Sequence, residues 1–345
     1  MKRPLRTIFR VIGTLVVLFG AFVLIVYNAL FAGPGEPAPG GYSFDIEEVR
    51  RLADSMPGDK PRAIAVETVG SFEWPELLTM AGGSLRTVWM GCFAFQLITP
   101  SGHYIIDTGM DREIAGAMPR TDFYEIAYDR MQAVIRTADL IAITHEHPDH
   151  IGGITKNPDV KSLHHALRLT HEQISDPDRH ANPPFPAGAL DGYEPLQYEG
   201  MTAIAPGVVL IAAAGHTHGS QMVYVQLADG REVLFLGDVA WMWKNVTNTT
   251  PRPKFVSDFA LPGGEDRPLV YSQLKFLREL TQNEPNIVQI PGHDMNVIRR
   301  LMQPPSLLAP MFVAAGERVA ETDAQADEPA IVEPAEEAEP APVEE

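Results

Sequence analysis

Five apolar, strand-like runs of this chain each end in a histidine or an aspartate, and this feature constrains the fold more than any other. Strand ends that meet on one edge of a sheet present their side chains to a common point. One such ending is typical of a turn, whereas five indicate convergence on a single site. The endings are IIDTG with Asp107, IAITHEHPDH with His145, His147, Asp149 and His150, AAAGHTHG with His216, LFLGD with Asp238, and VQIPGHD with His293.

The longest ending, THEHPDHIGG, holds three histidines and two acids in six consecutive positions. Imidazole nitrogens and carboxylate oxygens together suit zinc best, with iron or manganese as alternatives. His145 and His147 are expected to face the same way, while Asp149 and His150 continue around a turn, so the stretch serves two ions rather than one. The chain has a single cysteine in an apolar stretch, so any metal has to be held by histidine and carboxylate.

These residues resemble the signature of the metallo-β-lactamase-fold hydrolases, over roughly residues 63–300. THEHPDHIGG matches the family motif HxHxDH, and the other four endings follow the family's order. The resemblance implies an α+β fold, an αββα four-layer sandwich in which helices cover the outer faces of two packed sheets. It also implies two divalent metal ions, the first held by His145, His147 and His216, the second by Asp149, His150 and His293, with Asp238 as the bridge and Asp107 orienting the metal-binding loop through hydrogen bonds.

The predicted reaction is hydrolysis, because two neighbouring ions lower the pKa of a bridging water and provide hydroxide at neutral pH. Asp149 and Asp238 are the predicted catalytic residues, with Asp149 as the proton shuttle. The segments around Asp107 and after Asp238 are similar to N-acyl-homoserine lactonases, which carry a tyrosine three residues after the bridging aspartate. Trp241 stands there in this chain, and an indole donates a hydrogen bond but is no acid. Trp241 and His218 are the candidate substrate contacts.

The predicted substrate is a small molecule with an ester, lactone or thioester bond. Two alternatives stay open: a phosphodiesterase of the same fold, and a non-catalytic domain that binds metal or a partner. The formal net charge is −18, and eleven acids with one arginine from Glu317 onward leave about −8 for the rest. The body therefore lacks the basic stripe that nucleic-acid binding needs, and no nucleic-acid partner is expected.

The N-terminus carries an uncharged apolar run at residues 11–27 that extends to Phe31, about the roughly 20 residues that cross a bilayer. Its length, and the lack of an Ala-x-Ala sequence after it, favour an uncleaved anchor over a signal peptide. Four basic residues precede the run, which predicts a cytoplasmic N-terminus. In a bacterium the protein is then a single-pass inner-membrane protein with its catalytic domain in the periplasm.

The chain divides into four predicted parts. Residues 1–32 are the membrane anchor, and residues 33–43, with GPGEPAPGG, are a Pro/Gly-rich linker that lifts the domain off the membrane. Residues 44–316 form the catalytic domain. Residues 317–345, rich in Ala, Pro and Glu, are an acidic tail that is expected to be disordered, with solvation as its ordinary role and docking of a protein partner as the alternative.

Overall fold

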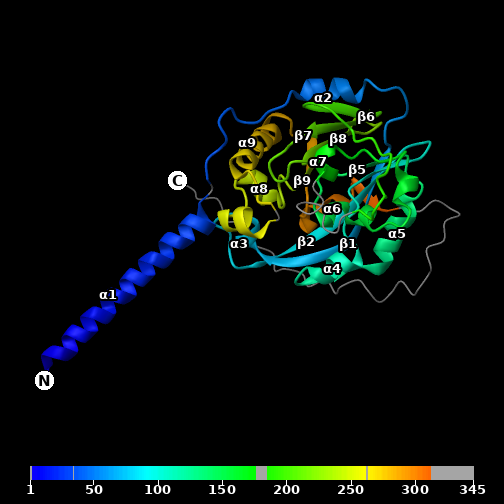
Figure 1. Cartoon of the computed structure of the whole chain (residues 1–345). Coiled ribbons are helices and arrows are strands. Elements are labelled where there is room, and N and C mark those ends of the chain that lie inside the picture. The colour runs from blue at the N-terminus through cyan, green and yellow to red at the C-terminus, as the bar shows by residue number, and fades with distance from the viewer. Residues whose placement is uncertain (1, 34, 176–184, 262, 312–345) are drawn as a thin grey trace.

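The computed structural model describes residues 2–33, 35–175, 185–261 and 263–311. Two mixed β-sheets form its centre (Figure 1). The first has the order β11-β1-β2-β3-β5 with β4 beside β1, where β1 is Ala63–Pro75, β2 Thr87–Ile98, β3 His103–Ile106, β4 Thr121–Phe123, β5 Leu140–Ala142 and β11 Leu308–Pro310. The second has the order β10-β9-β8-β7-β6, where β6 is Met201–Ala205, β7 Val208–Ala212, β8 Gln221–Gln226, β9 Glu232–Gly237 and β10 Ile287–Pro291.

Strand direction is mixed within both sheets. In the first, β1 and β2 pair antiparallel with Val66 opposite Phe95, whereas β3 and β5 pair parallel with Ile105 opposite Ile141. In the second, β9 pairs parallel with β10 and antiparallel with β8. Parallel pairs need a crossover, and the crossover between β3 and β5 carries helices to the outer face.

Apolar side chains alternate along the strands and create three separate cores. Phe95 of β2 and Val223 of β8 belong to the core between the sheets, together with Phe235 of β9. The neighbouring side chains point outward, with Ala94 packing under the helices of the first sheet and Tyr224 under those of the second. This period of two, repeated in strands of both sheets, stacks the molecule as helices, sheet, sheet and helices.

Helices on the two outer faces come from different parts of the chain, and Figure 1 shows α2 and α9 on the side of the body opposite α4 and α5. The first sheet is covered by α4 Arg112–Ala117, α5 Glu125–Ile135 and α6 Pro148–Thr155, and the second by α2 Ile46–Ala53 and α9 Arg267–Asn283. The remaining helical segments are α3 Glu76–Thr79, η2 Val160–Leu163, α7 His171–Ser175, α8 Trp243–Thr247, η3 Val256–Ala260 and α10 Met295–Met302.

The N-terminal apolar run forms α1, Lys2–Tyr27, followed by a short π-helix, η1 Asn28–Ala32. Within Phe9–Ala32, the most apolar window of 18 residues has a mean hydropathy of 2.5, and no residue of that window is buried in the protein. Figure 1 shows α1 projecting from the body. The helix is long and apolar enough to cross a membrane, a property that membrane spans share with signal sequences.

The predicted linker, residues 33–43, contacts the folded body at Ala38 and Tyr42. Ala38 N–H donates to the carbonyl of Pro268, 2.9 Å away, and also lies 2.9 Å from the Ser272 hydroxyl. Tyr42 donates its hydroxyl hydrogen to the Ala212 carbonyl at 2.8 Å. The described part of this segment therefore packs against the body, with backbone partners on α9, and its role as a linker remains a prediction. The predicted tail, residues 317–345, lies outside the described residues.

Candidate metal centre

The HxHxDH stretch leaves β5 and enters α6 directly. His147 is the N-cap of α6, and Pro148 occupies its first turn, where a missing N–H costs nothing. Asp149 lies in the same turn, at the end of the helix that favours negative charge. The loop therefore carries His145 and His147, and the helix start carries Asp149 and His150.

Close backbone packing holds α6 against the loop that follows β3. A Cβ atom added to Gly153 would lie 2.3 Å from the Thr108 carbonyl oxygen, so only glycine permits this approach. Thr108 in turn donates its N–H to the His150 carbonyl at 2.7 Å. The start of α6 is thus tied to the strand end that carries Asp107.

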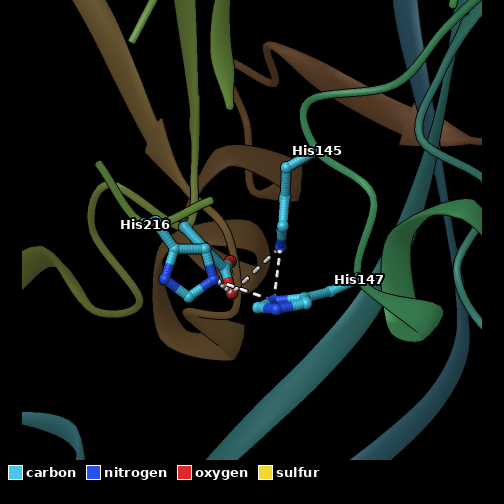
Figure 2. Close-up of side chains that lie close together, drawn as sticks. His145, His147 and His216 are labelled. Atoms are coloured by element: carbon cyan, nitrogen blue, oxygen red, sulfur yellow. Dashed lines mark hydrogen bonds and ion pairs between the residues drawn. The ribbon is translucent and has the colours of Figure 1, made fainter. Parts of the chain in front are cut away.

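Three of the predicted ligands of the first ion point at one another, as Figure 2 shows for His145, His147 and His216. His147 Nδ1 lies 3.1 Å from His145 Nε2 and 2.9 Å from His216 Nε2. Asp238 Oδ2 completes the group, 3.2 Å from His216 Nε2 and 3.6 Å from His145 Nε2. These four atoms come from three separate strand ends and form the first ligand group.

A second ligand group lies on the other oxygen of the same aspartate. Asp238 Oδ1 is 3.2 Å from His150 Nε2 and 3.1 Å from His293 Nε2. Asp149 Oδ2 lies 3.5 Å from His293 Nε2. Cys92 is also close, because its sulfur lies within 4.8 Å of ligand atoms of Asp149 and His293. Cys92 is buried, as its apolar stretch of sequence suggests, but its position beside this group was not predicted.

The outward-facing ring nitrogens of three histidines are held by oxygen atoms. His150 Nδ1 lies 2.9 Å from Asp107 Oδ2, His216 Nδ1 lies 3.1 Å from Glu265 Oε2, and His293 Nδ1 lies 2.8 Å from the Gly91 carbonyl. A carboxylate or carbonyl accepts a hydrogen bond, so these partners favour a proton on Nδ1 of His150 and of His293 and turn the Nε2 of each of the three rings toward the centre.

Asp107 has a backbone conformation suited to this task. Its φ of 56° lies in the left-handed region, which aspartate tolerates better than most residues. Besides His150, its carboxylate accepts the Thr144 N–H at 2.6 Å and the Thr144 hydroxyl at 2.8 Å. Asp107 therefore braces both the first residue of the loop and one predicted ligand.

Burial disfavours the charged form of the titratable side chains in this centre, but neighbouring charged groups outweigh the effect of burial on the pKa at several residues. His293 and His150 hold the pKa of Asp238 well below its usual range. Asp238 and Asp107 raise the pKa of His150 well above its usual value, against the effect of burial. Burial itself, together with the charge on His150, lowers the pKa of His145 well below its usual value. Asp238 is therefore an ionised carboxylate, and His145 is neutral, which is the form that binds a metal.

Sequence reasoning missed the partners of His216, which come from the segment between α8 and α9. Arg252, only 1% exposed, donates from Nε to Glu265 Oε2 at 2.9 Å and from Nη1 to the Asp238 carbonyl at 2.8 Å. Burial raises the pKa of Glu265, yet Arg252 and His216 outweigh it and lower that pKa to about 2. The sequence TPRPKF…GGEDR contains no motif that would have revealed this pair.

Glu146, the residue between the two loop histidines, points away from both ligand groups. Its Oε2 accepts the Thr217 hydroxyl at 2.9 Å, and its Oε1 accepts the Gly219 N–H at 3.1 Å. The side chain is fully buried, and burial raises its pKa. Glu146 thus joins the HxHxDH loop to the loop that carries His216.

The two candidate substrate contacts lie in different places. Trp241 is 4% exposed and donates its indole N–H to Asp238 Oδ2 at 2.6 Å, so this donor is engaged by the centre itself. Its ring also lies under the Arg252 guanidinium, 4.7 Å from the centroid. His218 is exposed and lines a separate pocket of about 420 Å³ with Tyr198 and Gln221. The structure therefore places Trp241 at the predicted ligands and His218 outside both ligand groups.

The donor atoms fit the metal that the residues imply. Zinc–nitrogen bonds of about 2.0–2.1 Å in a tetrahedron place neighbouring ligand atoms roughly 3.3 Å apart. The observed separations in the first group run from 2.9 Å between His147 and His216 to 3.6 Å between His145 and Asp238. Lone pairs that face one another at these distances repel unless a cation or a proton lies between them. The first group could hold a metal ion, and so could the trio of His150, Asp238 and His293 in the second; Asp149 lies within ligand range of His293 and Cys92.

Comparison with known proteins agrees with this centre. The family model described as the Metallo-beta-lactamase superfamily matches residues 88–293. This range includes all seven histidines and aspartates of the two ligand groups, and His293 is its last residue. An N-acyl homoserine lactonase of Bacillus sp is 24% identical over 242 residues, covering 63% of this chain and 86% of the lactonase. A hydroxyacylglutathione hydrolase of Aeromonas salmonicida (strain A449) is 30% identical over 110 residues, 32% of this chain and 36% of that protein.

A solved structure is similar over most of the folded part. The crystal structure of a quorum-quenching N-acyl homoserine lactone lactonase matches with a TM-score of 0.56 and 17% identity, and the match covers 72% of this chain and 98% of that one. At this identity the likeness shows a common fold.

Proposed function

Because the chain belongs to the metallo-beta-lactamase superfamily, we propose that it is a membrane-anchored hydrolase that holds two divalent metal ions and cleaves an ester, lactone or thioester bond. The observation that supports this most strongly is the division of Asp238 between two ligand groups. One of its oxygens faces His216, and the other faces His150 and His293. An aspartate shared in this way suits a pair of ions rather than one.

In this proposal His145, His147 and His216 hold the first ion, Asp149, His150 and His293 hold the second, and Asp238 bridges them. Zinc is the proposed metal, with iron or manganese as alternatives. Two such ions supply Lewis acidity toward a scissile carbonyl and an acidified water at neutral pH.

The chain's own residues position the groups that would act. Asp107, Glu265 and the Gly91 carbonyl hold the imidazole rings with Nε2 toward the centre. Asp149 has a 13% exposed side chain, whereas those of Asp238 and His293 are 3% and 1% exposed. Asp149 is therefore the carboxylate best placed to exchange a proton with substrate or solvent, and we assign it the shuttle role.

The substrate bond is proposed from the relatives and from one difference at the centre. The relatives named above are a lactonase and a hydroxyacylglutathione hydrolase, which favours small carbonyl substrates over phosphodiesters. The indole N–H of Trp241 is engaged by Asp238 Oδ2. Recognition of a substrate carbonyl therefore has to come from another group, and we do not restrict the proposed substrate to N-acyl-homoserine lactones.

The test is a substrate screen of the full chain in detergent after zinc loading and measurement of bound metal. The panel contains acyl-homoserine lactones, simple lactones, aryl esters, thioesters and a phosphodiester, with Asp238→Ala as the inactive control. Turnover of a carbonyl ester or thioester that Asp238→Ala abolishes would support the proposal. Two bound ions with no turnover on any carbonyl substrate would overturn it.

The proposed location is the bacterial inner membrane, with the N-terminus in the cytoplasm and residues 44–316 in the periplasm. The apolar stretch Phe9–Ala32 and the basic residues before it support this orientation. Resistance of the chain to carbonate extraction, combined with protease access from the periplasmic side, tests it. Release of a shortened soluble chain would show that the stretch is a cleaved signal.

A further inference from the structure

A continuous row of aromatic rings leads from the end of the apolar helix onto the folded body. Tyr27 stacks on Phe31 with centroids 6.2 Å apart, and Phe31 stacks on Phe255 at 5.2 Å. Phe255 lies 6.1 Å from Phe259 in a tilted arrangement. The first two rings belong to the apolar N-terminal segment, and the last two belong to the body, at η3. Figure 1 shows η3, in yellow, and α3 beside the end of α1.

A second contact brings the loop between α3 and β2 to the end of the apolar helix. The N–H of Gly82 donates to the Phe31 carbonyl at 2.8 Å, and Leu85 follows three residues later in the same loop. Leu85 is 81% exposed, Phe259 70% and Phe255 38%. We call these three residues the apolar face.

Such exposure is uncommon elsewhere on the described part of the body. Among the described residues after Ala32, five large hydrophobic side chains are strongly exposed, and three of the five form the apolar face. Isolated exposed apolar residues need no explanation, but a group that continues directly from an apolar helix does. The continuity indicates that the helix and the face share one environment.

The length of the apolar stretch sets the level of the face relative to a bilayer. The 24 residues of Phe9–Ala32 extend about 36 Å at 1.5 Å per residue, against a hydrocarbon core of about 30 Å. The last residues of the stretch, including Phe31, therefore stand at the boundary between acyl chains and headgroups. Phe255 contacts Phe31, so the apolar face lies at that boundary, where aromatic side chains are enriched.

We propose that the apolar face of Leu85, Phe255 and Phe259 rests in the surface of the bilayer that α1 crosses. The body is then held against the membrane by the face as well as by the anchor. This inference rests on the membrane anchoring in the proposed function, but not on hydrolysis. The occupant of the face is lipid rather than a protein partner, because the face continues the same row of side chains that enters the bilayer.

Site-directed spin labelling of the full chain in phospholipid nanodiscs tests the inference. The single native cysteine, Cys92, is buried, so an introduced cysteine is labelled selectively. Labels are placed at the face (Phe259→Cys and Leu85→Cys), in the middle of the apolar stretch (Val16→Cys) and on α2 (Glu47→Cys). Power saturation then compares collisions with oxygen, which dissolves in the bilayer, and with a water-soluble nickel chelate.

We expect the labels at 259 and 85 to resemble the label at 16, with oxygen collisions exceeding nickel collisions, and the label at 47 to show the reverse order. Labels at 259 and 85 that resemble 47, while 16 stays in the bilayer, would overturn the inference and leave the anchor in place. A water-exposed label at 16 would overturn both. In neither case does the result bear on hydrolysis, which is read separately by the substrate screen. As an independent check, Phe259→Ser should leave turnover of a water-soluble ester unchanged.

Discussion

Replacement of Glu265 by glutamine removes one negative charge from the partner of His216 with almost no change of shape. In the wild type, Glu265 Oε2 lies 3.1 Å from His216 Nδ1 and 2.9 Å from Arg252 Nε, and Oε1 accepts the Ser257 hydroxyl at 2.6 Å. Loss of a carboxylate that orients a ligand histidine typically weakens metal affinity or activity about 10- to 100-fold. We expect a zinc dissociation constant raised by that factor in Glu265→Gln.

The same change leaves the buried Arg252 guanidinium without its opposing carboxylate. Breaking a buried ion pair by removing one partner costs about 3–5 kcal/mol. The melting temperature of a domain of this size class changes by about 2–4 °C for each kcal/mol of stability. Even a loss of about 3 kcal/mol therefore predicts a melting temperature lower by about 6–12 °C. Because misfolding alone would also weaken metal binding, stability and affinity have to be separated.

A second variant separates them. In Arg252→Met/Glu265→Gln both charges are gone, so much of the stability should return, whereas the zinc affinity should stay weak because His216 still lacks its carboxylate. Competition with a chelator measures affinity, scanning calorimetry measures stability, and Glu47→Gln on the exposed side of α2 is the control. Wild-type zinc affinity in Glu265→Gln would refute the positioning role.

Four further outcomes are expected. Asp107→Ala should weaken metal binding at least 10-fold by chelator competition, because His150 and Thr144 lose a shared partner; wild-type affinity would contradict this role. Trp241→Phe removes a charge-assisted hydrogen bond to Asp238 and should lower the free energy of unfolding by about 1.5–3 kcal/mol in urea titrations, whereas an unchanged midpoint would show that the bond is not net stabilising. Burial raises the pKa of Glu76, but Lys244 and Ser84 outweigh it and lower that pKa to about 2. The contribution of the ionised Glu76 to stability is therefore complete above about pH 5 and is lost as the pH falls toward 2. Glu76→Gln should lose less stability in acid than the wild type, and parallel curves of unfolding free energy against pH for the two proteins would argue against this. Removal of zinc by a chelator should lower the melting temperature of the wild type more than that of Asp238→Asn, measured by scanning calorimetry.

The strand ends were accessible from sequence because they depend on a local pattern, whereas the four layers were inferred only from the resemblance to a known family. Alternation of apolar residues with period two marks the strands, and a histidine or acid after such a run marks the end that carries a side chain to the sheet edge. His145 and Asp238 could be predicted for this reason to converge. The interpretation of the seven residues as ligands of two ions remains a prediction, which the observed distances support.

The parts that sequence reasoning missed depend on long-range packing. Glu265 reaches His216 through the segment between α8 and α9, in which Arg252 bonds both Glu265 and the Asp238 carbonyl, and no local pattern encodes these contacts. Likewise, the composition of GPGEPAPGG describes a chain without internal structure but gives no sign that Ala38 bonds to Pro268 on α9. The His216–Glu265 contact joins residues 49 positions apart, and the contact between Ala38 and Ser272 of α9 joins residues 234 positions apart.

The packing of residues 35–42 against α9 bears on how far the hydrolytic centre can move. A flexible linker of this length would let the body rotate and change its position relative to the anchor. Contacts of Ala38 and Tyr42 with the body remove that freedom. If α1 crosses a bilayer, the centre stays at one height and one tilt above it, and encounters with membrane-dissolved substrates become a matter of lateral diffusion in two dimensions.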